Sequence, residues 1–258
     1  MKCPYCLSER LRVWRKAKDT IYQCEKCHSN IKVFHQAIDV YDDAYFGEHY
    51  EQVYGKSYEE DEPIIRSYSR RRLATIKEIV PSGHLVDVGA AYGFFADEAH
   101  QMGYDVSAVE IHDASIRYMQ DRFGYPVYRS LELITQPVDI ITLWFTMEHF
   151  PDVNAFMDTV KNSLRQGGCL ALGLPNGYGS FARFCPSEYL KKRPIEHHTE
   201  PSLKGISCFL KRHGFRVVHE EIFGLHPERI GLPNTALFKN VLKITRLGDT
   251  FEVYAVKQ

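Results

Sequence analysis

The 258-residue chain lacks any run of 18 apolar residues and any N-terminal signal pattern. A membrane span and a secreted product are therefore not expected, and the cytoplasm is the default location. The chain also lacks an overall charge, since 32 Lys and Arg stand against 33 Asp and Glu, and so has no global field to attract nucleic acid. What is present, 44% apolar and 25% charged residues, is typical of a globular protein with one sizeable core and a small appendage.

Charge is nevertheless uneven near the N-terminus. Residues 1–36 carry eight Lys and Arg against three acids, whereas residues 37–62 carry nine acids against one Lys. Two interpretations stay open: the segments attract each other, or the basic one binds a polyanion.

Cysteine is scarce outside the same region. Four of the seven cysteines form two CxxC pairs separated by 17 residues, a spacing that allows four thiolates to surround Zn²⁺ tetrahedrally. A reducing cytoplasm argues against disulfides. Between the pairs, residues 11–14 and 20–23 are expected to be short strands. The sequence therefore predicts a zinc ribbon over residues 1–36 whose metal is structural. The expected ligands are Cys3, Cys6, Cys24 and Cys27.

Residues 37–80 are predicted to be a tyrosine-rich helical segment. Tyrosines recur every four or five residues from Tyr41 to Tyr58, which places most of them on one helical stripe. The stripe either packs on the next domain or covers a ligand with its hydroxyls available for hydrogen bonds.

Residues 81–258 are predicted to form the main domain, an α/β fold with a mostly parallel sheet, because strand and helix patterns alternate. The expected strands are 85–89, 105–110, 126–129, 138–144, 169–174, 215–221 and 250–257. The expected helices are 93–102, 113–123, 152–165 and 201–213. Residues 223–248 have no strong pattern and are expected to form a long loop between the last two strands.

The glycine-containing turn after the first of these strands is the expected ligand site. Residues 85–95, LVDVGAAYGFF, read as a buried strand, a tight turn and a helix start, and such turns bind ligands at the carboxyl end of a parallel sheet. A dinucleotide fingerprint is absent, because Ala91 and Phe94 stand where it needs glycine. The expected cofactor-binding residues are Asp87, Gly89, Ala90, Ala91 and Gly93.

Glu110 ends the second strand, 21 residues after Gly89. A carboxylate there can accept hydrogen bonds from both ribose hydroxyls of a nucleoside. The other interpretation is a helix-capping acid, although Asp113 is better placed for capping.

The pattern Asp-x-Gly-x-Ala-x-Gly from Asp87 to Gly93 resembles motif I of the class I S-adenosylmethionine (SAM) methyltransferases, with Ala91 in place of the middle glycine. Glu148-His149 after the fourth strand resembles the EH signature of small-molecule methyltransferases, including the ubiquinone-pathway O-methyltransferases. Gly167-Gly168 and Pro175-Asn176 also match, and together the motifs cover about residues 80–220. The resemblance implies a Rossmann-like seven-stranded sheet that binds SAM.

The resemblance also implies roles for other residues. Ser130 and Leu131 would flank adenine, and Trp144 would lie against the cofactor or in the core. Glu148 and His149 would line the substrate side, where His149 contacts substrate or acts as a base unless it is structural. A second histidine is expected after the fifth strand, and the sequence leaves open whether His197 or His198 takes that position or whether both cap or face solvent.

The cysteine quartet, the tyrosine-rich segment and the catalytic domain together resemble the zinc-binding sugar C-methyltransferases, where an N-terminal tyrosine and histidines line the active site. The resemblance points to Tyr45 and Tyr50, with His149 and His198, and to a small-molecule acceptor such as a sugar, a nucleotide-sugar or a natural-product intermediate. Two alternatives remain. One is an RNA methyltransferase, since some rRNA guanine methyltransferases carry an N-terminal zinc ribbon, and the other is a non-catalytic SAM-binding or zinc scaffold protein.

Overall fold

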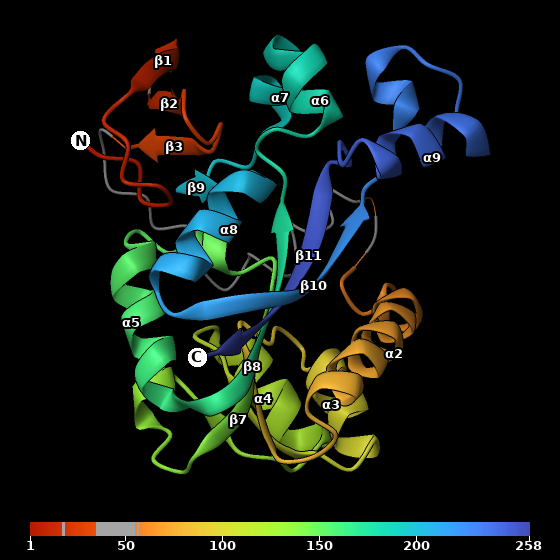
Figure 1. Ribbon diagram of the computed structural model, residues 1–258. Coiled ribbons are helices and arrows are strands. Elements are labelled where there is room, and N and C mark those ends of the chain that lie inside the picture. Colours follow the sequence, from red (N-terminus) through yellow and green to blue (C-terminus); the bar gives the residue numbers. More distant parts are fainter. Residues whose placement is uncertain (17–18, 35–54, 56) are drawn as a thin grey trace. The chain divides into compact units, whose positions relative to one another are not determined.

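The computed structural model describes residues 1–16, 19–34, 55 and 57–258 (Figure 1). The described chain divides into two compact units. The first contains the described residues of 1–38, 145–157 and 172–255, and the second those of 39–144, 158–171 and 256–258. The domain boundaries expected at residues 36 and 80 stay predictions.

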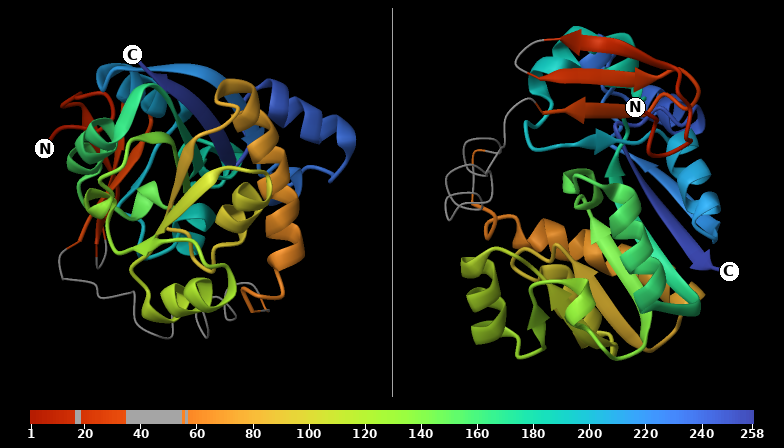
Figure 2. Two further views of the ribbon diagram at one scale, coloured as in Figure 1. Left: turned by 90° about the horizontal axis from the view of Figure 1, so that it is seen from below. Right: turned by 90° about the vertical axis from the view of Figure 1, so that its left-hand side faces the viewer.

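The first unit contains a four-stranded sheet with the order β1-β2-β3-β9 (Figure 1). Its strands are β1 (Leu11–Lys16), β2 (Thr20–Cys24), β3 (Asn30–Val33) and β9 (Thr199–Glu200). The sequence predicted β1 and β2 but neither β3 nor β9. Asn30 pairs with Glu200 and Ile31 with Thr199 in antiparallel register, so β3 pairs with a segment far along the chain (Figure 2, right).

The rest of the first unit is mainly helical. It contains η3 (Met147–His149), α6 (Ser180–Phe184), α7 (Pro186–Lys192), α8 (Leu203–Arg212), β10 (Phe215–Phe223), η4 (Pro227–Ile230), α9 (Ala236–Ile244) and most of β11 (Thr250–Lys257). Helix α9 corrects the expectation that residues 223–248 have no regular structure. Its exposed Leu237, Val241 and Ile244 recur at helical spacing, but too few residues are involved for the pattern to stand out in the sequence.

The second unit holds the predicted parallel strands. They are β4 (His84–Val88), β5 (Asp105–Val109), β6 (Val127–Tyr128) and β7 (Val138–Trp144), and the pairs β4–β5, β4–β7 and β5–β6 are parallel. With β8 (Leu164–Pro175), β10 and β11 they form a seven-stranded sheet in the order β10-β11-β8-β7-β4-β5-β6. This confirms the α/β Rossmann-like fold class.

The helices of the second unit are α2 (Glu62–Ile79), α3 (Phe94–Gln101), α4 (Asp113–Arg122) and η2 (Leu131–Leu133), and α5 (Val153–Ser163) has residues in both units. Helix α2 packs on α3 and buries Leu73 and Ile76. His112 caps α4 by accepting a hydrogen bond from the N–H of Ser115, so the capping role expected for Asp113 falls to its neighbour. None of the helices in the described part of the chain has the length and hydropathy needed to cross a bilayer.

Candidate active site and zinc centre

The turn between β4 and α3 contains three residues with left-handed backbone. Gly89, Ala91 and Gly93 have φ values of 73°, 50° and 77°. Gly93 is the N-cap of α3, and a Cβ there would lie 2.7 Å from the side chain of Met119, so the position requires glycine. An alanine with this backbone costs about 1 kcal/mol relative to glycine. The turn at Ala91 must therefore be held by its surroundings.

Glu110, directly after β5, holds the turn. Its side chain is buried, and Oε2 accepts a hydrogen bond from the N–H of Ala91 at 2.8 Å. Oε1 accepts hydrogen bonds from the N–H groups of Ile111 and His112 at 2.7 and 3.0 Å. A carboxylate has about four acceptor positions, so with the turn intact Oε2 keeps one position for a hydroxyl donor.

Backbone hydrogen bonds reinforce the same turn. The N–H groups of Gly89 and Ala90 both donate to the carbonyl oxygen of Val109, at 2.8 and 3.2 Å, and Ala90 is buried. The end of β5 therefore fixes both sides of the turn, which places the carboxyl ends of β4 and β5 together as the sequence predicted.

Asp87 lies near the carboxyl end of β4 and is 2% exposed. It faces Thr142 of β7 in the parallel register, and the Thr142 hydroxyl donates to Oδ1 at 2.6 Å. Burial raises the pKa of Asp87 to about 7, while the Thr142 hydrogen bond and the Arg72 charge act in the opposite direction. The carboxyl therefore titrates near neutrality, and a nearby cation would favour its charged form.

Aromatic side chains pack beside these acids. Tyr58 stacks on Phe94 with ring centroids 5.8 Å apart, and burial raises the pKa of its phenol, which stays protonated. The ring centroids of the half-buried Trp144 and of Phe95 lie 5.1 Å apart, and the Arg72 guanidinium lies over the Trp144 ring, 4.2 Å from its centroid. Trp144 is thus in contact with Phe95 and with the cation whose charge lowers the pKa of Asp87.

Ser130 and Leu131 occupy the loop after β6. The Ser130 hydroxyl donates to Oε2 of Glu132 at 2.5 Å, and Leu131 is 2% exposed. Their expected role beside adenine stays a prediction.

A second group of polar side chains lies within the first unit. Glu148, His149 and His197 bring one carboxylate oxygen and two ring nitrogens within 4.8 Å of one another. The rings of His149 and His197 are perpendicular, with centroids 4.9 Å apart. Burial raises the pKa of Glu148 to about 8 and lowers that of His149 to about 4, the latter helped by the His198 charge. Both imidazoles are neutral at pH 7, because burial also lowers the pKa of His197.

Glu200 orients His197. Nδ1 of His197 lies 2.8 Å from Oε1 of Glu200, while Nε of Arg193 lies 2.9 Å from Oε2, which also accepts a hydrogen bond from the Tyr189 hydroxyl. Glu200 and Arg193 are both almost fully buried. This arrangement turns Nε2 of His197 away from Glu200.

The remaining predicted substrate-side residues are placed differently. His198 packs against Phe34 with ring centroids 4.4 Å apart, and the backbone N–H of His198 donates to the carbonyl oxygen of Glu148 at 2.8 Å. The structure thus groups His197, rather than His198, with His149. Tyr45 and Tyr50 lie outside the described residues.

The turn, its two acids and the parallel strands agree with the comparisons. A family model described as a methyltransferase domain matches residues 58–220, more than half of the chain. The chain belongs to this methyltransferase family. No curated protein matches it.

Solved methyltransferases share the fold. A SAM-dependent methyltransferase from Archaeoglobus fulgidus is 16% identical with a TM-score of 0.60, over 81% of this chain and 98% of that one. A magnesium protoporphyrin IX methyltransferase from Synechocystis PCC 6803, solved with S-adenosylhomocysteine, is 12% identical with a TM-score of 0.55, over 84% and 97%. A glycopeptide N-methyltransferase solved with SAM is 14% identical with a TM-score of 0.52, over 75% and 94%.

The cysteine quartet of this methyltransferase is assembled as the spacing predicted. The four Sγ atoms lie within 4.8 Å of one another, with Cys3 and Cys27 3.6 Å apart and Cys6 and Cys24 3.5 Å apart. Four sulfurs bound tetrahedrally to Zn²⁺ at about 2.3 Å would be about 3.8 Å apart. The observed separations fit that ion with little movement.

The two CxxC turns use the same hydrogen bonds. The residue after each pair has a left-handed backbone, with φ of 58° at Leu7 and 66° at His28. The backbone N–H of each donates to the carbonyl oxygen of the first cysteine of its pair, at 2.9 and 2.8 Å respectively. Cys3 and Cys24 in turn each donate to a serine carbonyl five residues later, at 2.9 Å. The two turns thus share one backbone conformation, which suits the binding of a single ion by both cysteine pairs.

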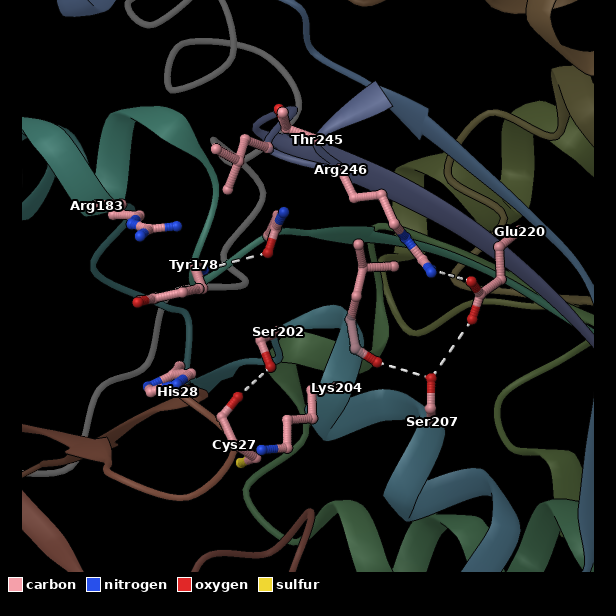
Figure 3. Close-up of a pocket in the computed structure, with 13 residues that line it drawn as sticks. Cys27, His28, Tyr178, Arg183, Ser202, Lys204, Ser207, Glu220, Thr245 and Arg246 are labelled. Atoms are coloured by element: carbon pink, nitrogen blue, oxygen red, sulfur yellow. Dashed lines mark hydrogen bonds and ion pairs between the residues drawn. The ribbon is translucent and has the colours of Figure 1, made fainter. Parts of the chain in front are cut away.

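Beside the second CxxC turn, the first unit contains a cavity of about 420 Å³ (Figure 3). The rings of His28 and Tyr178 are stacked with centroids 4.3 Å apart, and the Arg183 guanidinium lies 5.2 Å from the Tyr178 ring centroid. Lys204 also lines the cavity, and Arg246 does so while paired with Glu220. Three basic side chains and the stacked rings of His28 and Tyr178 thus lie among the residues that line the cavity.

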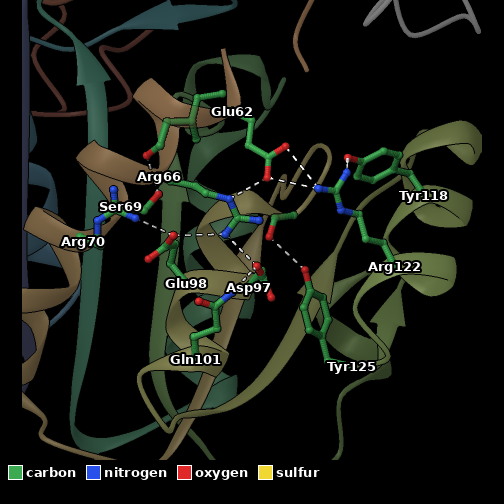
Figure 4. A network of polar contacts seen from close by, with 12 residues as sticks. Glu62, Arg66, Ser69, Arg70, Asp97, Glu98, Gln101, Tyr118, Arg122 and Tyr125 are labelled. Atoms are coloured by element: carbon green, nitrogen blue, oxygen red, sulfur yellow. Dashed lines mark hydrogen bonds and ion pairs between the residues drawn. The ribbon is translucent and has the colours of Figure 1, made fainter. Parts of the chain in front are cut away.

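A polar network positions helix α3 in the second unit (Figure 4). Arg66 of α2 contacts Glu62 of its own helix at 2.8 Å, and Asp97 and Glu98 of α3 at 2.7 and 3.2 Å. Because Gly93 is the N-cap of α3, these ion pairs stabilise the helix that follows the left-handed turn.

Sequence reasoning missed three residues of these sites, namely Thr142, Arg72 and Glu200. Thr142 had a usable signal, because aligning the carboxyl ends of the predicted first and fourth strands sets it opposite Asp87. Arg72 and Glu200 had none, since their roles depend on how α2 and β9 pack.

Proposed function

We propose that the chain transfers a methyl group from SAM to a small-molecule acceptor. The observation that carries the proposal is the buried pair Asp87 and Glu110 around the left-handed turn at Ala91. Membership of the methyltransferase family and the SAM and S-adenosylhomocysteine in two similar structures support it.

The residues of the turn fit such a cofactor. Glu110 keeps one acceptor position on Oε2 for a ribose hydroxyl, and Asp87 supplies an anion whose charged form a cation would favour. Ser130, Leu131 and Trp144 are proposed to flank the adenine or the methionine part. When bound, SAM supplies an electrophilic sulfonium methyl group for in-line attack by the acceptor.

In this proposal the protein aligns the acceptor with the methyl group and removes a proton from the acceptor. Alignment of reacting groups contributes about 7–11 kcal/mol at its best. His149 and His198 are the proposed proton acceptors, and burial keeps the His149 imidazole neutral at pH 7. A positioned base adds about 10²–10⁴-fold when the acceptor must lose a proton. Tyr45, Tyr50 and Glu148 are proposed to contact the acceptor.

We further propose that Cys3, Cys6, Cys24 and Cys27 hold a structural Zn²⁺ and that residues 1–36 form a zinc ribbon. The grouping of the four sulfurs within 4.8 Å of one another supports this. With all four positions filled by protein, such an ion would stabilise the fold and take no part in chemistry.

RNA as the acceptor remains the second candidate, favoured by the basic lining of the cavity beside His28. Several basic side chains of the ribbon are instead used internally, which favours a small molecule. Arg15 donates to the carbonyl oxygen of Leu190 at 2.7 Å, and Lys32 pairs with Asp19 at 3.1 Å.

One experiment separates these functions. Calorimetry with SAM should give saturable binding, and methyl transfer from labelled SAM should then be screened against sugars, nucleotide-sugars, phenols and total RNA. Transfer to RNA with steep salt dependence would favour the second candidate. Tight SAM binding without transfer to any class would indicate the non-catalytic scaffold, and absence of SAM binding would refute the proposal.

A further inference from the structure

Apart from the cysteine quartet, the described residues contain one other group of metal-ligand type, formed by Glu148, His149 and His197. Two imidazoles and one carboxylate are a ligand set that suits first-row divalent metals such as Mn²⁺, Fe²⁺, Co²⁺ and Zn²⁺. The three side chains come from two segments of the first unit, η3 and the stretch before β9.

Glu148 has a buried oxygen that nothing in the described structure satisfies. Its side chain is 1% exposed, and Oε2 has no hydrogen-bond partner. Burying a carboxylate oxygen without a donor or a cation costs several kcal/mol, so native proteins rarely leave one. A cation bound at Oε2 would remove this cost.

His197 is already set in the orientation of a metal ligand. Glu200 accepts the hydrogen bond of Nδ1 at 2.8 Å, which leaves the lone pair on Nε2. A carboxylate behind a ligating imidazole is the usual support for metal-bound histidine. Arg193 and Tyr189 fix Glu200 in turn.

The charges around the group also favour a dication. Three nearby carboxylates, Glu148, Glu196 and Glu200, are buried against one buried guanidinium, that of Arg193. The neighbouring Lys32 is paired with Asp19 and adds no net charge. With all three carboxyl groups ionised, the form that a bound cation favours, the cluster would carry a formal charge of −2, which one divalent cation neutralises.

We propose that Glu148, His149 and His197 bind a divalent metal ion, in addition to the ion of the cysteine quartet. Three protein ligands leave coordination positions open, as in catalytic metal sites. The use of those positions for an acceptor oxygen rests on the proposed function, but metal binding itself does not. An imidazole nitrogen that ligates a metal cannot also take a proton, so His198 then becomes the remaining candidate base.

The test is a metal titration of the full chain carrying one Zn²⁺ in the cysteine quartet. Mn²⁺ is the probe, because thiolate sites bind it poorly. Calorimetry or Mn²⁺ electron paramagnetic resonance should detect one Mn²⁺ per chain. Glu148→Gln and His197→Gln should each weaken it at least tenfold, since each removes one ligand.

His198→Gln is the matched control, because His198 is adjacent in sequence but packs on Phe34. It should keep Mn²⁺ affinity within about twofold. Circular dichroism and one retained Zn²⁺ per chain would establish that each variant is folded. No binding of Mn²⁺, Co²⁺ or Zn²⁺ at millimolar concentration beyond the first ion, or equal loss in all three variants, would overturn the inference.

The two proposals fail separately. If the chain binds SAM and transfers methyl groups but binds no second ion in the titration, the proposed function stands and the second metal site is refuted. If the chain binds a second ion but has no affinity for SAM, the metal site stands and the proposed function is refuted.

Discussion

Oε2 of Glu110 accepts a hydrogen bond from the N–H of Ala91 at 2.8 Å, so the acid at the end of β5 holds the residue whose left-handed backbone shapes the turn after β4. One side chain therefore has two tasks, to support the turn and to keep an acceptor position for ligand. Substitutions at the two positions should separate these tasks.

Glu110→Ala should weaken SAM binding at least tenfold, about 1.4 kcal/mol, because it removes the ribose acceptor and frees the N–H of Ala91. Calorimetry measures the affinity. Glu78→Ala, which removes an exposed acid of α2 in the same unit, is the control and should bind SAM as the parent does. Unchanged affinity in Glu110→Ala would remove Glu110 from the site.

Ala91→Gly should raise the free energy of unfolding by about 1 kcal/mol, because glycine accepts a φ of 50° without strain. For a chain of this size the melting temperature should rise by about 2–4 °C. The control is Ala90→Gly. Ala90 has no left-handed backbone, so glycine relieves no strain there and should lower the melting temperature. If Ala91→Gly melts lower than the parent, the turn is not strained.

Asp87 should make the ligand-free protein less stable as the pH rises. Burial raises its pKa to about 7 in the folded chain, from the ordinary value of 3.8 for an aspartate. The folded state thus keeps a proton that the unfolded state loses, and this group's contribution to stability falls between about pH 4 and pH 7. Asp87→Asn should therefore melt higher than the parent at pH 8, by a margin that shrinks towards pH 5, while it binds SAM more weakly. Thermal melts across this range measure the margin, and one that does not vary with pH would contradict the assignment.

Removal of zinc should affect more than the ribbon. A chelator should release one Zn²⁺ per chain and unfold residues 1–36, and β9 should lose protection from hydrogen exchange because β3 pairs with it. Metal analysis and hydrogen exchange of residues 195–202 measure both effects. Cys208→Ser, at an exposed cysteine outside the quartet, should retain the ion. A chain isolated without zinc would refute the ribbon assignment.

His149→Ala and His198→Ala should lower turnover more than SAM affinity, by about 10²–10⁴-fold where the residue serves as the base. Steady-state kinetics and calorimetry on the same samples give the two values. His219→Ala, at an exposed histidine of β10, is the control. Unaltered turnover in both variants would exclude these histidines as bases.

The parallel strands could be predicted because their signals are local. The range of β7 was predicted to the residue, and the positions of Asp87 and Glu110 near the ends of β4 and β5 were predicted from the strand pattern and a spacing. Each depends on a few adjacent residues whose apolar pattern and turn chemistry agree.

The histidine cluster could be predicted only in part. His149 follows a recognisable strand, but the choice of His197 over His198 as its neighbour depends on the pairing of β3 with β9 and on the hydrogen bond between His197 and Glu200. Those contacts join residues more than 150 positions apart or depend on burial, and neither leaves a periodic pattern in the sequence. Two-residue strands such as β9 are similarly invisible before their partner is known.

The pairing of Asn30 with Glu200 also has a consequence for biosynthesis. A ribosome adding about 5–20 residues per second needs roughly ten to thirty seconds to pass from β3 to β9. Throughout that interval the outer edge of β3 has no strand beside it, and such an edge can pair with another nascent chain. Early capture of zinc would order the ribbon while it waits for its fourth strand.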